Sequence, residues 1–169
     1  RRIVVDKGQQ NNIEAGQPVI DEIGVVGQVT RTFPFASEIT LITDKEQSVP
    51  VQIVRNGLRS VVFGLGSGQL ELRFMPANAD VQNGDLLVTS GLDGIFPTGL
   101  PVARVTHIER DTSYSFARIF CEPLAGVENY SEVLVLAKRV PEAIPDEALS
   151  PKNKQTAKPG SKKKRLKRD

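Results

Sequence analysis

Two side chains in this sequence could carry nucleophilic chemistry, the single histidine, His107, and the single cysteine, Cys121. A thiol becomes a nucleophile when a neighbouring base or a helix N-terminus keeps it ionised. His107 falls inside a strand pattern, and Cys121 ends the run that begins at Ser115. Neither lies among glycines or helix starts. The sequence therefore favours an exposed strand histidine and a small core cysteine, with a Cys–His dyad as the alternative.

Patterns for metals and phosphates are weak. One cysteine and one histidine cannot supply the four ligands of a structural metal site. Asp44-Lys45-Glu46 fits a solvated polar turn better than a calcium loop. The glycine-rich stretch 64–68 has no helix after it, so we interpret it as a hairpin turn and not a nucleotide loop. We therefore expect no enzyme activity, no metal and no cofactor.

Charge divides the chain into two regions. Residues 152–169 hold nine of the 22 basic residues and one of the 20 acidic ones, which leaves 13 basic and 19 acidic residues in 1–151. Pro and Lys dominate residues 141–169, which we expect to be a disordered tail. Its basic run, 162–168, could bind a polyanion or anionic lipid, but a solubilising terminus is the simpler interpretation. The body lacks basic, aromatic-bearing strands, so no nucleic-acid partner is expected.

Strand and turn signals recur along the whole body, and helical signals are nearly absent. With 39% hydrophobic residues, 5% aromatics and no Trp, the core must consist of Val, Ile and Leu, which suit strands. The expected strands are 2–6, 17–21, 25–31, 38–43, 49–55, 59–65, 69–74, 85–89, 101–109, 115–122 and 132–138. Such a series predicts an all-β fold, as a sandwich or as barrels.

Residues 49–74 give the clearest local prediction, a three-stranded meander. Asn56-Gly57 fits a tight hairpin turn with two positive-φ residues. The alternation in 70–74 places Phe74 on the apolar face of the third strand. Pro50 should lie at a strand start or an edge, where its missing N–H does no harm.

Two segments resemble each other, Asn12–Ile20 and Asp80–Val88. In each, a polar and a β-branched residue are followed by two spacers, a glycine, a polar residue and an apolar run. A valine-rich strand follows each of them. This pattern favours two related β-modules, with convergent turn chemistry as the rival explanation.

Three segments together resemble the rod shape-determining MreC family. They are residues 16–29, residues 41–59 with Asn56-Gly57 near their end, and residues 81–102 with the run Val88-Thr-Ser-Gly-Leu-Asp-Gly-Ile-Phe-Pro97. The similarity covers about residues 2–138. One departure is Ala103, where the family commonly has glycine after Pro-Val.

The resemblance implies two small β-barrel-like subdomains of short antiparallel strands. We expect the first at 1–75, joined by strands from the C-terminal end of the fold, and the second at 76–140. It also implies a protein on the periplasmic side of the bacterial inner membrane, anchored by a segment upstream of Arg1. The implied partners are the elongation-specific class B penicillin-binding protein, the MreD, RodZ and MreB complex, and a second copy of the chain.

The residues most typical of the family have structural duties first. A turn motif that orders the segment between two strands consists of Gly84, Asp85, Thr89, Ser90, Gly91, Gly94, Pro97 and Gly99. Four residues are candidates for contact with a partner: Phe33, Pro34, Phe35 and Phe96. For Phe96, pinning the loop to a barrel is the alternative to anchoring a partner.

The sequence therefore predicts a non-enzymatic scaffold of the cell-wall elongation complex. It would maintain rod shape by binding and organising peptidoglycan synthases and by self-association. A periplasmic adaptor of an efflux or secretion system is one alternative, and a nucleic-acid-binding β-barrel protein is another.

Overall fold

The computed structural model describes residues 1–111, 113–126 and 132–137, so the predicted tail at 141–169 lies outside the described residues. Across this part of the chain there are eleven strands, and each overlaps one of the eleven predicted strands. The all-β prediction is confirmed. A short 3-10 helix at Gln9–Asn11, η1, was not predicted.

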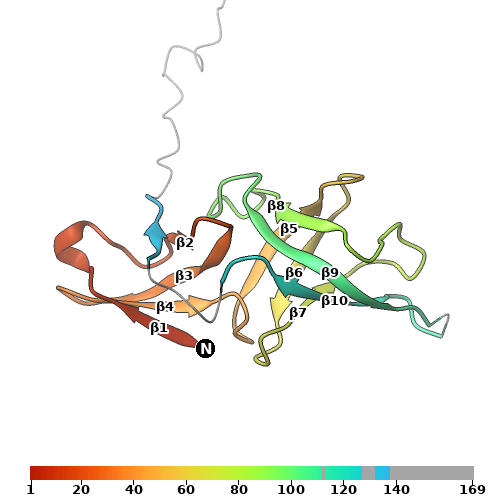
Figure 1. The fold of residues 1–169 in the computed structure, drawn as a ribbon, viewed down its shortest axis with the longest axis horizontal. Helices are drawn as coiled ribbons and strands as arrows, with labels where there is room; N and C mark the ends of the chain where they lie inside the picture. Colours follow the sequence, from red (N-terminus) through yellow and green to blue (C-terminus); the bar gives the residue numbers. More distant parts are fainter. Residues whose placement is uncertain (112, 127–131, 138–169) are drawn as a thin grey trace, which may run out of the picture. The chain divides into compact units, whose positions relative to one another are not determined.

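Five strands form an antiparallel sheet in the order β1-β4-β3-β2-β11 (Figure 1). Their bounds are β1 Arg2–Val5, β2 Pro18–Ile20, β3 Val25–Thr32, β4 Ser37–Leu41 and β11 Leu134–Val135. Alternate residues point inward, because successive side chains in a strand face opposite sides. The inward set includes Val19, Val29, Ile39 and Leu41, all fully buried.

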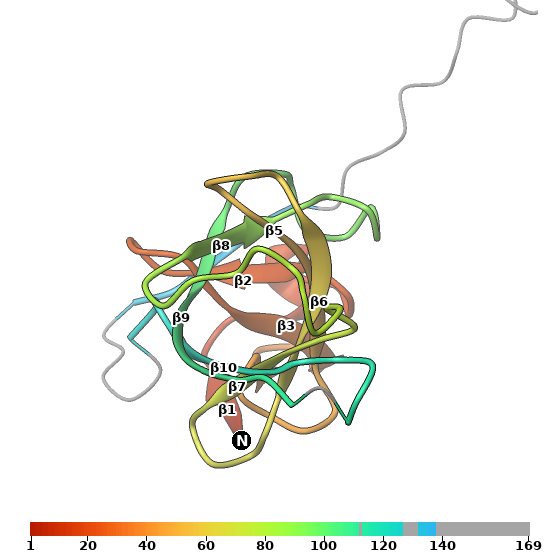
Figure 2. The same ribbon diagram turned by 90° about the vertical axis from the view of Figure 1, so that its right-hand side faces the viewer.

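The other six strands close into a barrel in the order β10-β7-β6-β5-β8-β9, which Figure 2 shows as a ring of strands. Their bounds are β5 Ser48–Ile53, β6 Arg59–Gly64, β7 Leu70–Arg73, β8 Leu86–Thr89, β9 Pro101–Glu109 and β10 Arg118–Pro123. The barrel core consists almost entirely of aliphatic side chains, as the composition predicts, with Leu70, Leu72, Leu87 and Ile119 fully buried.

The expected division at residue 75 does not follow these sheets. Strands β5, β6 and β7 precede residue 75 but share one barrel with β8–β10, and β11 returns from the C-terminal side to pair with β2. Period-2 patterns mark where strands are, but they carry no information on partners. Closing the barrel removes the unpaired edges that a three-stranded meander would leave.

The two similar sequence segments adopt the same local structure. Gly16 and Gly84 both have positive φ, 95° and 90°. The Gly16 N–H donates to the carbonyl of Val29 at 2.7 Å, and the Gly84 N–H donates to that of Val105 at 2.8 Å. The β2–β3 and β8–β9 pairs that follow each contain one register shift at the corresponding place. The structure thus agrees with two related β-modules.

The turn after β5 differs from the prediction. Only Gly57 has positive φ, and the Ile53 N–H donates to the carbonyl of Leu58, so four residues form the loop instead of two. The Asn56 side chain makes two hydrogen bonds: it donates to the carbonyl of Asp80 at 2.7 Å and accepts from the Leu58 N–H.

Pro50 lies within β5, close to where its partner strand ends. The ladder with β8 begins at Val51, and the Pro50 carbonyl accepts from the N–H of Ser90, which follows β8. The nitrogen of Pro50 faces the same side, beyond the end of that ladder. Pro50 is the third residue of β5 and is paired with β6 in a closed barrel, so the prediction of a strand start or an edge is wrong. Its missing N–H leaves the pair with Ser90 with one hydrogen bond, and the Ser90 carbonyl accepts from the Thr98 hydroxyl at 3.4 Å.

Candidate protein-interaction surface

The β3–β4 hairpin carries the strongest predicted contact, Phe33-Pro34-Phe35. Its tip is held on the backbone of η1. The N–H groups of Gln9 and Gln10 donate to the carbonyls of Phe33 and Pro34 at 2.9 and 3.0 Å. A Cβ on Gly8 would lie 2.1 Å from the Phe33 carbonyl oxygen, so only glycine permits this approach.

Both aromatic rings of this tip lie at the surface. Phe33 is 46% exposed and Phe35 is 74% exposed, and Pro34 between them is exposed as well. The backbone is fixed before any partner binds, so little ordering entropy opposes contact. The structure thus places these three predicted residues together on one surface.

Phe96 behaves differently from the other candidates. It is 3% exposed and packs in the barrel core. The expectation that it anchors a partner is therefore wrong, and the alternative, that it pins its loop to the barrel, is the one that the structure supports. Burial of an apolar side chain against the barrel is stabilising. The sequence alone does not show whether a phenylalanine in this loop is buried or exposed.

The predicted turn motif orders the connection between β8 and β9. The Thr89 hydroxyl donates to the carbonyl of Pro97 at 2.5 Å and accepts from the Leu100 N–H at 2.9 Å. Ser90 is buried. All four glycines of the motif have positive φ: Gly84, Gly91, Gly94 and Gly99. Two aliphatic side chains that we did not predict, Leu92 and Ile95, are exposed on this ordered loop.

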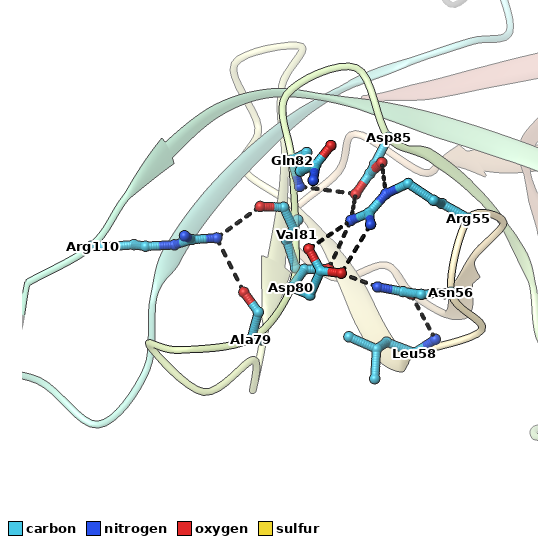
Figure 3. Close-up of polar contacts among 9 residues, drawn as sticks. All are labelled: Arg55, Asn56, Leu58, Ala79, Asp80, Val81, Gln82, Asp85 and Arg110. Carbon is cyan, nitrogen blue, oxygen red and sulfur yellow. Dashed lines mark hydrogen bonds and ion pairs between the residues drawn. The ribbon is translucent and has the colours of Figure 1, made fainter.

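A polar cluster fixes the turn before β8 (Figure 3). The guanidinium of Arg55 donates to Asp85 and to Asp80, with nitrogen–oxygen distances of 2.9 to 3.1 Å. The Asp85 carboxylate also accepts from the Gln82 N–H at 2.9 Å. Hydrogen bonds from Arg55, more than any other contact, hold the pKa of Asp85 below its usual value. Arg110 donates to the carbonyls of this segment on its other side.

Gly84 and Asp85 thus have the turn role that we predicted, but the partner of Asp85 was not foreseen. Local sequence patterns could not predict this pair, because Arg55 and Asp85 are 30 residues apart in the sequence. The barrel brings them together by pairing β5 with β8. The cluster is a structural clamp, since its carboxylates are already occupied by the guanidinium and by backbone N–H groups.

Sequence reasoning missed an aromatic patch on the barrel, made of Phe63, Phe74 and Phe116. Phe74 meets the other two rings edge to face at 6.0 and 6.5 Å, and the guanidinium of Arg73 lies 4.4 Å from the centre of the Phe63 ring. Phe74 and Phe116 are 62% and 54% exposed. We predicted Phe74 to be inside, but its φ of 67° ends the alternation and turns the ring outward.

The candidate Cys–His dyad does not form. The two residues lie on neighbouring strands, but Cys121 points into the barrel core and His107 points outward, where it stacks on Phe120 at 6.0 Å. Burial raises the pKa of the Cys121 thiol to about 12. Such a thiol stays protonated and unreactive at neutral pH.

The described residues contain no group of three or more His, Cys, Asp or Glu side chains that could hold a metal ion. The stretch Gly64–Gly68 is a hairpin turn, as predicted, with positive φ at Gly66 and Gly68. A membrane-crossing helix is likewise not found in the part of the chain that the structure describes.

These features define a class: a small all-β protein with a barrel, an open sheet and pre-ordered apolar loops at its surface. The family follows from comparison. Residues 1–137 match the family described as "Rod shape-determining protein MreC, barrel core", and the chain belongs to this family.

Curated relatives agree. The chain is 42% identical over 136 residues to the cell shape-determining protein MreC of Escherichia coli K12, and 43% identical over 137 residues to that of Haemophilus influenzae. Each alignment covers 80% of this chain but only 37% and 39% of those proteins. The chain thus spans about two fifths of the relatives it matches.

Solved structures show the same fold. MreC from Pseudomonas aeruginosa matches with a TM-score of 0.79 and 42% identity, over 80% of this chain and 88% of that one. The MreC of a complex between Penicillin-Binding Protein (PBP2) and MreC from Helicobacter pylori matches with a TM-score of 0.60 and 24% identity. That alignment covers 73% of this chain and 80% of the other.

Proposed function

We propose that this chain is part of a non-enzymatic scaffold that helps to determine cell shape. It would bind and organise peptidoglycan synthases on the periplasmic side of the inner membrane and would also self-associate. Membership of the MreC family supports this role, as do relatives named cell shape-determining proteins. The same membership favours the scaffold over an efflux adaptor or a nucleic-acid-binding barrel.

The partner that we propose first is the elongation-specific class B penicillin-binding protein. A related fold was solved in complex with PBP2, which supports this choice. The MreD, RodZ and MreB complex remains an expected partner from the family resemblance. We also propose a membrane anchor upstream of Arg1, again from that resemblance.

The observation that carries the proposal is the pre-ordered hairpin tip. Two exposed phenylalanines on a loop that is fixed by backbone hydrogen bonds make a compact apolar contact point. Interfaces are enriched in aromatic residues, and a few such residues supply most of the binding energy. We propose that Phe33 and Phe35 contact the penicillin-binding protein or a second copy of the chain.

The test is a double substitution, Phe33→Ser with Phe35→Ser. Binding to the purified periplasmic part of the penicillin-binding protein, and sedimentation of the chain alone, would be measured beside far-UV circular dichroism. We expect at least one of the two associations to weaken about tenfold or more while the spectrum is unchanged. Unchanged association of both kinds would reject the tip as a contact.

A matched control is Val54→Ser with Leu58→Ser. Both residues have exposed apolar side chains in the loop after β5, so this double substitution also removes apolar surface. They should leave both associations intact. Equal loss in both double variants would mean that the effect is general and not specific to the tip.

A further inference from the structure

Each strand of the five-stranded sheet corresponds to one strand of the six-stranded barrel. Following the shared hydrogen bonds and register shifts of the two β-modules, β2, β3 and β4 correspond to β8, β9 and β10. The β3–β4 and β9–β10 hairpins also share a side-chain hydrogen bond. The Thr30 hydroxyl donates to the Glu38 carbonyl, and the Thr106 hydroxyl donates to the Phe120 carbonyl. On the flanks, β1 then corresponds to β7 and β11 to β5.

Among the residues that the structure describes, the barrel strand without a counterpart is β6. In the barrel, β6 lies between β5 and β7 and closes the ring. In the five-stranded sheet the corresponding position lies between β11 and β1, which are the two edges. Unpaired edge strands expose backbone N–H and C=O groups that can pair with another strand.

The space between these edges is a groove with an apolar floor. A cavity of about 920 Å³ is lined by residues of both β1 and β11. Four of the lining side chains are only partly buried and pack on the inner core of the sheet: Ile3, Val5, Val133 and Val135. They occupy the positions that correspond to the fully buried Leu70, Leu72, Val51 and Ile53 in the closed barrel.

Charge at the rim defines what would fit. In the barrel, Val61 of β6 lies opposite Pro50 on one side and Arg73 on the other. Counting along the corresponding strands, Pro50 matches Glu132 and Arg73 matches Asp6. Both carboxylates are exposed and line the groove, and the exposed Lys7 next to Asp6 lines it as well, so the rim carries two negative charges and one positive charge. The two carboxylates would therefore flank one outward side chain of a sixth strand, and opposite charges across a strand pair are stabilising.

We propose that this groove is a strand-acceptor site for an extended segment of a partner protein. The segment would pair with both β1 and β11, place small or β-branched apolar residues on its inner face, and carry Lys or Arg between Asp6 and Glu132. Backbone pairing provides affinity and the alternate side chains provide specificity in such strand addition. This site is additional to the hairpin tip and goes beyond the proposed function.

The probe is a peptide that copies β6, residues 59–65, with Val61→Lys. Binding would be measured by anisotropy of the labelled peptide, and its location by amide NMR shifts of the full chain. We expect shifts in β1 and β11, and at least fivefold tighter binding than for the same peptide with Val61→Glu. The advantage should shrink as salt is added, because the rim charges are exposed.

Two controls separate the proposed contacts. In the chain variant Asp6→Asn with Glu132→Gln, the lysine and glutamate peptides should bind equally. A lysine peptide that also carries Val62→Pro should lose binding, because proline cannot donate to a ladder.

Three outcomes would overturn the proposal. The first is equal binding of both peptides to the unaltered chain, and the second is shifts confined to the barrel strands. The third is concentration-dependent protection of the β1 and β11 amides without peptide, which would make a second copy the occupant. Absence of binding at millimolar peptide would count with the first of these.

Discussion

Arg55 and Asp85 form a two-pronged ion pair across the barrel end. Arg55 Nε donates to Asp85 Oδ1 at 2.9 Å, and Nη2 donates to Oδ2 at 3.0 Å. Asp85 is 7% exposed and also accepts from the Gln82 N–H. One carboxylate thus joins the loop after β5 to the turn before β8. Such charge-assisted paired bonds are stronger than neutral ones.

This pair predicts how stability depends on pH. The pKa of Asp85 is lowered in the folded chain, chiefly by the hydrogen bonds from Arg55. A lowered folded pKa adds stability that is fully present above the unfolded value, about 3.9, and is lost as pH falls through the folded value. The free energy of unfolding of the Asp85→Asn variant should therefore be about 1–3 kcal/mol lower than that of the unaltered chain at neutral pH. This difference should become smaller as the pH is lowered.

Urea denaturation between pH 2 and 7 would measure this difference. Asp93→Asn is a suitable control, since the carboxylate of Asp93 accepts from the backbone N–H groups of Ile95 and Phe96 in its own loop. Parallel pH curves for the unaltered chain and Asp85→Asn would show that the ion pair does not carry the acid dependence.

The backbone of Phe74 predicts an unusual order of stabilities. With φ at 67°, this bulky residue occupies a region that L-residues other than Gly, Asn and Asp seldom adopt, at a cost of about 1–2 kcal/mol. Phe74→Asn and Phe74→Ala both remove the edge-to-face contacts with Phe63 and Phe116. Only Ala retains the backbone cost, so the Asn variant should be more stable by about 1 kcal/mol.

Thermal and chemical unfolding of the two Phe74 variants would measure their order. Equal stability would mean that the chain relaxes away from positive φ once the ring is removed. The matched substitutions at Phe116, to Asn and to Ala, should show no such difference, since Phe116 has no positive φ.

Burial of Cys121 predicts a thiol that is silent in the folded chain. With the pKa raised to about 12, the thiolate fraction at pH 8 falls roughly a thousandfold below that of a free cysteine. A disulfide reagent should therefore label Cys121 only on unfolding, and at the same rate in a His107→Ala variant. Rapid labelling of the folded chain, slowed by that substitution, would instead reveal an activated dyad.

Most of the strand positions could be predicted because they depend on local chemistry. Period-2 alternation, β-branched residues and Gly or Asn at turns act over a few residues, and all eleven predicted strands overlap an observed one. The prediction failed where one residue changed the backbone. At Phe74 positive φ reverses the facing of the ring, and at Asn56 a distant carbonyl of Asp80 recruits the side chain.

The candidate surface shows the same division. Phe33 and Phe35 could be proposed from sequence, because two aromatics around a proline at a predicted hairpin tip cannot easily both be buried. Phe96 could not be assigned, since its exposure depends on whether a barrel lies beneath its loop. Leu92 and Ile95 went unnoticed for the same reason.

The sequence by itself determined the positions of the strands, the aliphatic core, the repeated β-module and the family, because these depend on neighbouring residues and their spacing. The tertiary structure alone decided which strands pair, that one sheet closes while the other keeps two edges, and that Arg55 meets Asp85. These depend on contacts between residues far apart in the chain. Their energies are set by burial and by geometry, and local patterns do not encode either.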